Sequence, residues 1–355
     1  MQTKISDTTE LMIPRYLGLA EIHRNGEHFD VILGYSSKTK KELQLDEEGL
    51  QGLQAFLRPN SAEKVARELG ICQQEANEFC QYLYDEGILR QTRESGQFAR
   101  YDRHMLFYDL QGENGLEVQK RLSSKSIALV GMGGIGCWSS INLIGAGFKE
   151  LRLIDFDTIE ISNLTRQILF KEEDVGALKG EVAKRELQAR NKETKVNFVE
   201  LKVDGEDGLR DALAGVDFVI VSADTPVGIH NWVDHVCFEH KIPYLNVGYR
   251  DGVGVVGPLT EHGKTSCYEC FKKKGQDEVS NVVFSNFYGR YQAPSFGPLN
   301  AMASTMACME VIKYFAQMGE LLSFDSEINI DPMTMELSFK KYSRDEHCWQ
   351  CGDAN

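Results

Sequence analysis

The sequence predicts an α/β protein, in which a mostly parallel sheet carries helices on both faces and a smaller N-terminal domain precedes it. Three observations predict this fold. Short apolar runs alternate with helical patterns from about residue 104 onward. A glycine cluster follows the first of these runs, at the point where a strand would turn into a helix. The chain has 355 residues, 42% hydrophobic and 26% charged, enough for one large and one small globular domain.

The first elements are strand-like stretches within residues 14–46, interrupted by the turn signal Asn25-Gly26. Three short helical patterns come next, at residues 47–57, 62–70 and 73–89. Asn60 stands three residues before Glu63, which predicts a capping box for the second helix. Strands followed by three helices predict a small winged-helix-like domain.

A polar stretch, residues 91–103, then predicts a linker. We therefore place the N-terminal domain at residues 1–95 and the second domain at residues 96–355. Short apolar runs in the second domain predict strands at 126–131, 151–157, 196–203, 217–224 and 242–249. Helices are expected through residues 141–147, 180–191 and 298–316. Because the runs are nearly continuous in apolar residues, they predict a Rossmann-like, mostly parallel sheet that is buried on both faces.

The last of these helices contains small residues, Ala301, Ala303, Ser304 and Ala307. Small side chains permit close helix packing, which predicts burial in the core or in a dimer interface.

Composition and charge exclude several classes of protein. A net charge of −14 argues against non-specific binding to nucleic acid or to anionic lipid. The longest apolar runs have the length of a strand, well short of a membrane span. Residues 1–14 lack a basic segment followed by an apolar one, so the pattern of a secretory signal is not met. Nine cysteines, an odd number, fit a reducing cytoplasmic setting better than a disulfide framework.

The glycine cluster, Gly131, Gly133, Gly134 and Gly136, predicts a phosphate site. Glycines let the backbone turn tightly and approach a phosphate, whose charge the N–H groups of a helix N-terminus then meet. Asp155 lies 19 residues after Gly136, at the end of the next strand, where a carboxylate accepts hydrogen bonds from ribose hydroxyls. Both a dinucleotide site and an ATP site contain this combination, so it leaves the nucleotide open.

Three charged residues favour ATP. Arg166 follows the second strand of the sheet and Lys179 comes shortly after, and fixed cations stabilise the charge that develops on a departing pyrophosphate. Asp224 ends another strand, where ligands bind in open α/β sheets, and a carboxylate beside phosphates suits Mg²⁺. Taken singly, Arg166 and Lys179 could be surface charges and Asp224 a helix cap, so the interpretation depends on their occurring together in this order.

At this point the sequence resembles the ATP-dependent adenylating enzymes related to ubiquitin activators. That family includes the activators of the sulfur carriers in thiamine and molybdopterin synthesis. The segments that carry the resemblance are GMGGIG, LRLIDFDTIEISNLTRQILF, the spaced Lys179 and SADTP, within roughly residues 98–352.

The resemblance implies a role for each matching residue. Asp155 would hold the ATP ribose, and Asp224 would bind Mg²⁺. The remaining nucleotide contacts would come from Asp157, Asn163, Arg166, Gln167 and Lys179. Arg103, in RYDRHMLF, matches an arginine that the family donates into the ATP site of a partner subunit, which implies a homodimer.

Two CxxC pairs, Cys267 with Cys270 and Cys348 with Cys351, supply the four thiolates of a closed tetrahedral zinc site. The 77 residues between the pairs exceed the spacing of a compact zinc ribbon, and a redox CxxC is the rival explanation. In the related enzymes two distant pairs hold a structural zinc, and the resemblance therefore implies Zn²⁺ here.

Ubiquitin activators that form a thioester place a cysteine after the first CxxC, but residues 271–298 contain none. Cys137 and Cys237 fall in expected helices and are interpreted as packing residues. Adenylation without transfer to an enzyme thiol is therefore the simpler expectation.

The N-terminal domain has helix-turn-helix rhythm, which raises DNA binding as an alternative. Residues 63–94 contain four basic and seven acidic side chains, the wrong sign for a phosphate backbone. The domain instead resembles the leader-peptide recognition domain of enzymes that modify ribosomally made peptides. Over nearly its whole length the chain is similar to the adenylating enzymes of microcin C and pantocin biosynthesis.

The sequence therefore predicts an ATP- and Mg²⁺-dependent enzyme that activates a carboxylate or amide of a short precursor peptide in antibiotic biosynthesis. Two alternatives remain at this stage. One is activation of a ubiquitin-like sulfur carrier at its C-terminus, for which the additional 95 residues are the main difficulty. The other is an NAD-dependent oxidoreductase.

Overall fold

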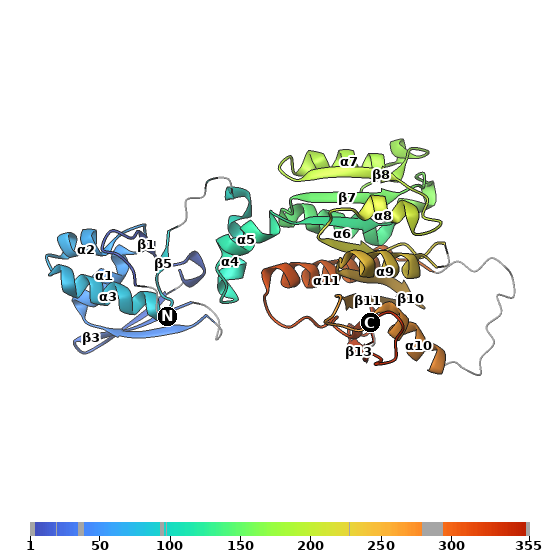
Figure 1. Cartoon of the computed structure of the whole chain (residues 1–355). Helices are drawn as coiled ribbons and strands as arrows, with labels where there is room; N and C mark the ends of the chain where they lie inside the picture. The colour runs from blue at the N-terminus through green and yellow to red at the C-terminus, as the bar shows by residue number, and fades with distance from the viewer. Residues whose placement is uncertain are drawn as a thin grey trace. The chain divides into compact units, whose positions relative to one another are not determined.

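The computed structural model describes residues 4–18, 20–34, 39–92, 96, 98–226, 228–278 and 294–352. The chain forms two compact units, Met1–Gln119 and Lys120–Asn355 (Figure 1). Within the described ranges, no helix is both long and apolar enough to cross a membrane.

The first unit contains a three-stranded antiparallel sheet in the order β2-β3-β4. These strands are β2 (Ala20–Asn25), β3 (His28–Leu33) and β4 (Lys41–Leu45). The turn predicted at Asn25-Gly26 is confirmed, because Asn25 pairs with His28 and Gly26 has a φ of 68°. Three helices follow as expected: α1 (Glu47–Ala55), α2 (Ala62–Leu69) and α3 (Gln73–Asp85). A short pair of strands, β1 (Leu11–Met12) and β5 (Arg90–Gln91), lies before and after these three helices in the sequence.

The cap predicted for α2 is displaced by one residue. Ser61, and not Asn60, is the N-cap, and its hydroxyl accepts the N–H of Lys64 at 3.4 Å. The backbone of Asn60 is instead held by Leu11, with N···O distances of 2.7 and 2.9 Å. That strand-like pairing fixes Asn60 before the helix begins, so the next residue caps it.

Residues 96–119 belong to the first unit by their contacts. They include η2 (Ala99–Tyr101), α4 (Asp102–Leu110) and the first part of α5 (Gly115–Leu122). A 3₁₀ turn, η1 (Arg15–Leu17), contacts α4, where Arg15 and Asp102 form an exposed ion pair at 3.2 Å. The predicted linker is therefore shorter than expected, because η2 and α4 begin within residues 91–103. The functional boundary predicted between residues 95 and 96 stays a prediction.

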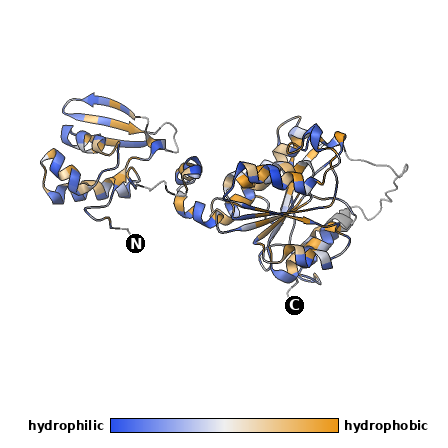
Figure 2. Cartoon of the chain, turned by 90° about the horizontal axis from the view of Figure 1, so that it is seen from above, coloured by the Kyte–Doolittle hydropathy of each residue, from blue (hydrophilic) through white to orange (hydrophobic). Residues whose placement is uncertain are grey.

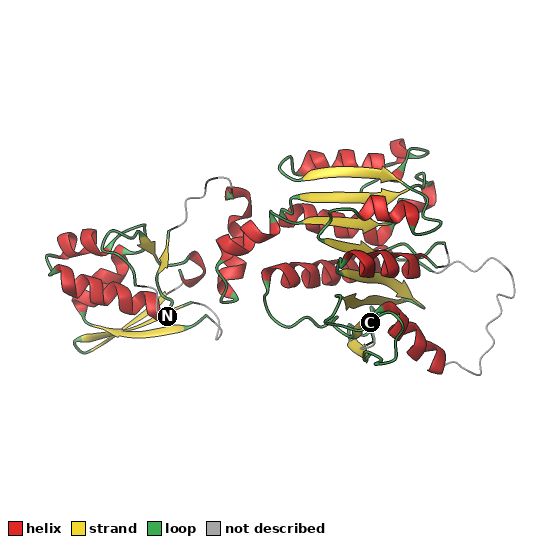
Figure 3. Ribbon diagram, in the orientation of Figure 1, coloured by secondary structure: helices red, strands yellow, loops and turns green. Residues whose placement is uncertain are grey.

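The second unit is built on one eight-stranded sheet in the order β13-β12-β11-β10-β9-β6-β7-β8 (Figures 1 and 3). Its parallel half consists of β6 (Ser126–Val130), β7 (Glu150–Asp155), β8 (Lys195–Glu200), β9 (Phe218–Val221) and β10 (Tyr244–Arg250). This half confirms the five predicted strands.

Three further strands were not predicted: β11 (Val253–Thr260), β12 (Ser326–Ile330) and β13 (Leu337–Lys341). They extend the sheet antiparallel from β10.

Helices cover both faces of this sheet because its strands alternate apolar residues between the two faces. The bounds of the helices are α6 (Gly134–Ala146), α7 (Lys179–Arg190), α8 (Asp207–Leu213), α9 (Ile229–His240), α10 (Tyr268–Glu278) and α11 (Gly297–Ala316). Ala128 and Val219 pack with α8 and α9 in one core cluster. Phe218 packs against Phe315 of α11, with ring centroids 5.9 Å apart. Figure 2 shows the hydrophobic residues along the inner strands of the sheet.

The small residues of α11 serve core packing. Ser304 is fully buried and donates to the backbone oxygen of Ile135 in α6 at 3.0 Å. Ala303 and Ala307 are also fully buried. Because α6 begins in the glycine loop, the close contact of α11 with α6 helps to hold that loop in place.

Candidate active site

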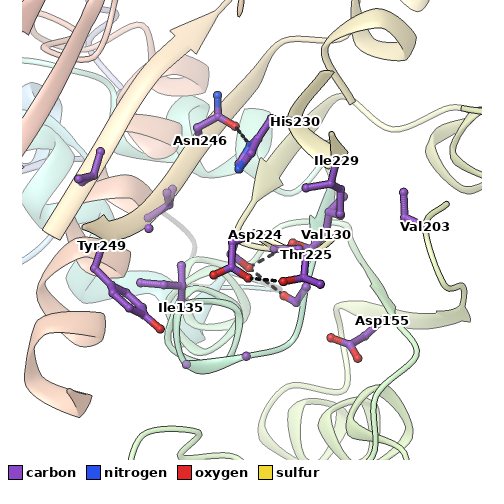
Figure 4. A pocket seen from close by; sticks show the side chains of 18 of the residues that line it. Val130, Ile135, Asp155, Val203, Asp224, Thr225, Ile229, His230, Asn246 and Tyr249 are labelled. Atoms are coloured by element: carbon purple, nitrogen blue, oxygen red, sulfur yellow. Dashed lines mark hydrogen bonds between the residues drawn. The ribbon is translucent and has the colours of Figure 1, made fainter. Parts of the chain in front are cut away.

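The carboxyl ends of the parallel strands open into a cavity of about 570 Å³ (Figure 4). Ligands bind at this edge in open α/β sheets because the crossovers leave a crevice there. The predicted residues that line the cavity are Gly131, Gly133, Gly134, Asp155, Asp157, Arg166, Gln167, Lys179 and Asp224. The structure thus brings together most of the predicted nucleotide set, although these residues span nearly a hundred positions of the sequence.

The glycine loop lies between β6 and α6 and leaves room for a ligand at the helix N-terminus. Gly131 has a φ of 98°, a conformation that other residues rarely adopt. A Cβ on Gly134 would stand 2.1 Å from Nδ2 of the buried Asn300. No side chain caps the helix at Gly133, so its first N–H groups are available to an anion.

Asp155 holds the shape of this loop. Its Oδ2 accepts the N–H of Met132 at 2.6 Å and its Oδ1 accepts that of Asp157 at 2.7 Å. Burial raises the pKa of this carboxyl, and the two backbone hydrogen bonds oppose the rise. Each oxygen keeps a further lone pair, so the carboxylate can still accept a ribose hydroxyl.

Lys179 and Asp157 are tied together at the start of α7. The ammonium of Lys179 lies 2.8 Å from Oδ2 of Asp157, and the backbone N–H of Lys179 donates to the backbone oxygen of Asp157 at 2.9 Å. The lysine side chain is only 9% exposed, whereas Asp157 is half exposed. An incoming phosphate would therefore meet a lysine that is already held in place.

Arg166 adds a second cation to this side of the cavity, and the neutral Gln167 lies next to it. Arg166 donates to the backbone oxygen of Ser162 at 2.8 Å, which leaves further N–H groups of its guanidinium for a ligand. Gln167 is 3% exposed, and its Oε1 has no hydrogen-bond partner among the described residues.

Three predicted residues do not line the cavity. Gly136 packs inside α6, where a Cβ would stand 2.1 Å from the oxygen of Gly131. Asn163 is buried and accepts the N–H of Glu160 at 3.1 Å, which closes the 3₁₀ turn η3 (Ile161–Asn163). Arg103 is exposed on α4 of the first unit. Their roles toward the nucleotide stay predictions.

Other residues of the cavity were not predicted. Among them are His230, Asn246, Tyr249, Arg250, Tyr268, Phe271 and Glu327. Most lie at the end of β10, on α9 or directly after Cys267. The signal that could have found Asn246 and Tyr249 is their position at the carboxyl end of a predicted strand.

The four paired cysteines come together as predicted. Their sulfur atoms all lie within 4.8 Å of one another. Cys267 and Cys348 are 3.6 Å apart, and Cys270 and Cys351 are 3.5 Å apart. Tetrahedral coordination with Zn–S bonds of 2.3 Å requires sulfur atoms about 3.8 Å apart, so the cluster fits Zn²⁺. Because all four positions are filled by thiolates, a zinc ion here would be structural.

Asp234 connects this cluster to the sheet. Its carboxylate accepts hydrogen bonds from the Tyr244 hydroxyl at 2.5 Å, the Gln350 amide at 2.7 Å and the Tyr268 N–H at 3.3 Å. Tyr268 also lines the cavity, so the residue that follows the first cysteine of the cluster forms part of its wall.

Two other predictions concerned cysteines: the packing roles of Cys137 and Cys237, and the lack of a cysteine in residues 271–298. Cys137 and Cys237 are buried in α6 and α9, as expected of packing residues. Burial raises the pKa of the Cys137 thiol to about 12, which removes it as a nucleophile. The cysteine-free segment 271–298 lies partly outside the described residues, which resume at 294.

A glycine loop at a helix N-terminus, the carboxylate of Asp155, the cations Arg166 and Lys179 and a four-cysteine cluster are the features expected of an ATP-dependent adenylating enzyme. Residues 101–350 match the ThiF family, and the chain belongs to that family. It is 29% identical over 258 residues to the molybdopterin-synthase adenylyltransferase of Salmonella typhimurium, covering 72% of this chain and 97% of that relative. It is 28% identical over 265 residues to the ThiS adenylyltransferase of Escherichia coli, covering 73% and 96%. The relatives are adenylyltransferases, so the dinucleotide alternative is not supported.

Solved structures match a larger part of the chain. E. coli MccB with AMPCPP and MccA matches with a TM-score of 0.74 and 31% identity, covering 97% of this chain and 100% of that one. The same enzyme has been solved with ATP, where the TM-score is 0.73. PaaA matches with a TM-score of 0.70 over 91% of this chain, and at 19% identity it shows the fold alone.

Proposed function

We propose that this adenylyltransferase activates a carboxylate or amide of a ribosomally made precursor peptide during antibiotic biosynthesis. The main support for the proposal is how much of the chain matches the sequence relatives and how much matches the solved structures. The sulfur-carrier adenylyltransferases align with about 72% of the chain, whereas MccB aligns with 97%, including the first unit. MccB is an enzyme solved in complex with the peptide MccA.

The chemistry follows from the charges of the cavity. An acyl oxygen of the peptide attacks the α-phosphorus of ATP, the bond to the bridging oxygen breaks, and pyrophosphate leaves. Arg166 and Lys179 would stabilise the charge on the phosphates, and Asp155 would fix the ribose. Asp224 is exposed in the cavity, and its carboxylate contacts only the Thr225 hydroxyl, at 3.2 Å, among the described residues. It fits a Mg²⁺ ion, which would neutralise phosphate charge.

The first unit would hold the peptide. β2 forms one edge of its sheet, and all six of its residues are exposed. An exposed edge presents unpaired backbone groups, to which an extended peptide adds as a further strand. In the assembly that we propose, a homodimer, Arg103 of one subunit would reach the ATP site of the other.

ATP–pyrophosphate exchange tests the proposal on the full-length, zinc-loaded protein with Mg²⁺. Synthetic peptides encoded by short neighbouring reading frames serve as substrates. We expect exchange that requires both ATP and a peptide. Asp224→Ala should lower the rate at least about 100-fold because the metal and the charge it balances are lost. Asp211→Ala, an exposed acid outside the cavity, is the matched control and should keep the wild-type rate.

The second candidate is activation of a ubiquitin-like sulfur carrier, which the sequence relatives favour. Exchange with such a carrier, and none with the peptides, would establish it in place of the peptide function.

A further inference from the structure

One wall of the cavity is a β-hairpin that carries a cation next to its turn. β10 and β11 pair with each other as far as Arg250 and Val253. The two residues between them, Asp251 and Gly252, have φ of 52° and 82°, the left-handed conformation of a tight hairpin turn. Arg250 is thus placed at the carboxyl end of β10, and it lines the cavity.

A buried acid holds this cation. Nη2 of Arg250 lies 2.6 Å from Oε1 of Glu327 in β12, and the two side chains are 60% and 2% exposed. The other oxygen of Glu327 accepts the hydroxyl of Tyr342 at 3.4 Å. Among the described residues, the guanidinium has no further hydrogen-bond partner. The pair therefore presents to the cavity the remaining N–H groups of an arginine whose position is fixed.

The place of Arg250 in the fold separates it from the other cations of the cavity. Among the described residues of the lining, the other lysine and arginine side chains are Arg166 and Lys179, which follow β7. In the sheet, β7 lies on one side of β6, whereas β9 and then β10 lie on the other. Arg250 therefore comes from the opposite side of the glycine loop, which follows β6.

A cation on this side is needed when the attacking group is an anion. In the proposed reaction, an acyl oxygen approaches a polyanionic triphosphate. A carboxylate would be repelled unless a cation balances its charge, whereas an amide is neutral and needs none. A guanidinium suits this task because its planar fork pairs with both oxygens of a carboxylate.

We propose that Arg250 is a catalytic residue that binds the carboxylate of the acyl substrate and holds it for attack on the α-phosphorus of ATP. One carboxylate oxygen forms the new bond to phosphorus, the bond from phosphorus to the bridging oxygen breaks, and pyrophosphate leaves with that electron pair. Arg250 stays on the other oxygen and exchanges no proton. This inference rests on the proposed function and deepens it, because it selects a carboxylate over an amide as the activated group.

Binding of a matched pair of probes tests this role. N-acetylglycine and N-acetylglycinamide differ only in carboxylate against carboxamide. Their affinities are measured by ligand-detected saturation-transfer NMR on the full-length, zinc-loaded protein with Mg²⁺ and a non-hydrolysable ATP analogue. We expect the wild type to bind N-acetylglycine at least about ten-fold more tightly, because charge-assisted hydrogen bonds to a carboxylate are the strong ones.

Variants assign the preference to Arg250. Arg250→Gln should weaken binding of N-acetylglycine at least about ten-fold and change that of N-acetylglycinamide by less than about two-fold. Affinity for the ATP analogue shows that the fold is intact. If Arg250→Gln loses that affinity, Arg250→Lys takes its place and should weaken N-acetylglycine binding at least about three-fold, because an ammonium lacks the fork.

The chain offers a matched control outside the cavity. Arg185 pairs with the buried Asp174 at 2.7 Å, and the two side chains are 56% and 5% exposed. Arg185→Gln therefore loses a comparable ion pair and should keep both probe affinities. In peptide-dependent pyrophosphate exchange, Arg250→Gln should lower kcat/KM for the peptide at least about ten-fold and leave KM for ATP unchanged, whereas Arg185→Gln should change neither.

Equal affinities of the wild type for the two probes, tighter binding of the amide, no binding of either, or unchanged N-acetylglycine binding in Arg250→Gln would overturn this role. An unchanged kcat/KM for the peptide in Arg250→Gln would do the same. Failure of the proposed function is a different result. It would appear as absent peptide-dependent exchange in the wild type, and the two probes would still decide the role of Arg250.

Discussion

At the scale of single residues, packing restricts the glycine loop to glycine as strongly as backbone conformation does. Gly134 faces the buried amide of Asn300, whereas Gly145, in the same helix, has open space where a Cβ would be. Substitutions at the two positions therefore separate the cost of filling the space at the helix N-terminus from the general effect of a glycine in a helix.

Gly134→Ala should weaken ATP binding at least about ten-fold, because its methyl group would force Asn300 and the helix N-terminus apart. Gly145→Ala should stabilise α6 by about 0.5–1 kcal/mol and leave ATP affinity unchanged. Calorimetric titration and urea unfolding measure the two effects. Equal ATP affinity in both variants would contradict this account of the loop.

His230 predicts a dependence of stability on pH. Burial lowers its pKa in the folded state below the unfolded value, so the unfolded chain binds more protons between the two values. The stability of the wild type should therefore fall relative to His230→Gln as pH decreases below about 6.5, by at most ~1.4 kcal/mol per pH unit. Asp224 opposes this effect, since its charge raises the pKa of the imidazole.

Chemical unfolding of both proteins from pH 8 to pH 5, without nucleotide or Mg²⁺, gives the difference in the free energy of unfolding. A difference that stays constant over this range would mean that the imidazole is not buried in solution.

At the scale of elements, the four-cysteine cluster holds residues 348–351 next to the segment that contributes Tyr268 to the cavity wall. Asp234 of α9 holds Gln350 of the second CxxC pair and the N–H of Tyr268 beside the first. Tyr268 in turn stacks on His230, with ring centroids 5.7 Å apart. Loss of the metal should therefore disturb the cavity wall that contains Tyr268 and His230 more than the glycine loop.

Cys351→Ala should remove bound zinc and lower the free energy of unfolding by several kcal/mol, since a structural metal contributes directly to folding. Cys72→Ala, at an exposed cysteine outside the cluster, is the control and should keep the zinc content. Because Cys72 is the N-cap of α3, this variant should lose at most the ~0.5–2 kcal/mol of a helix cap. Metal analysis and thermal unfolding measure the outcome. Retention of one zinc per chain in Cys351→Ala would rule out the four-cysteine site.

The strands and helix caps also show which elements sequence patterns can predict and which they cannot. The five parallel strands were predictable because each contains a short run rich in apolar residues between helical patterns. β12 and β13 were missed because their exposed and buried residues mix charge with apolar side chains, as in Ser326–Ile330 and Leu337–Lys341. The cap at Ser61 was missed because a contact with Leu11, about fifty residues away, decides it.

At the scale of the whole molecule, the two units pose the question of how many chains complete one active site. Arg103 belongs to the first unit, and the cavity lies entirely in the second. The family resemblance implies that this arginine acts in the partner subunit. A homodimer with shared sites follows as a prediction.

Mixing two inactive variants tests this arrangement. Arg103→Ala and Asp224→Ala should each have low activity alone. If Arg103 acts in the partner, a mixed dimer contains one intact site, and unfolding and refolding the two together should restore roughly a quarter of wild-type exchange. No recovery, with mixed dimers demonstrated by differential tagging, would place Arg103 in its own subunit's site or outside the reaction.

The sequence by itself determined the kind of chemistry. Glycines at fixed spacing, an acid at the end of the next strand, and Arg166, Lys179 and Asp224 in order are local signals, because each occupies a defined position relative to its own strand or helix. The two CxxC pairs supply four thiolates, which together with the family resemblance indicated zinc. These features indicated ATP and zinc before any distance was known.

The tertiary structure decided which residues contact one another across separate helices and strands. The pairing of His230 with Asn246, the contact of Asn300 with Gly134 and the three connections of Asp234 join residues from separate elements. No periodicity records such contacts, because they depend on how β10, α9 and α11 pack across the sheet. The cavity wall around His230 and Asn246 therefore becomes visible only in the folded chain, whereas the wall around the glycine loop is predictable from consecutive sequence motifs.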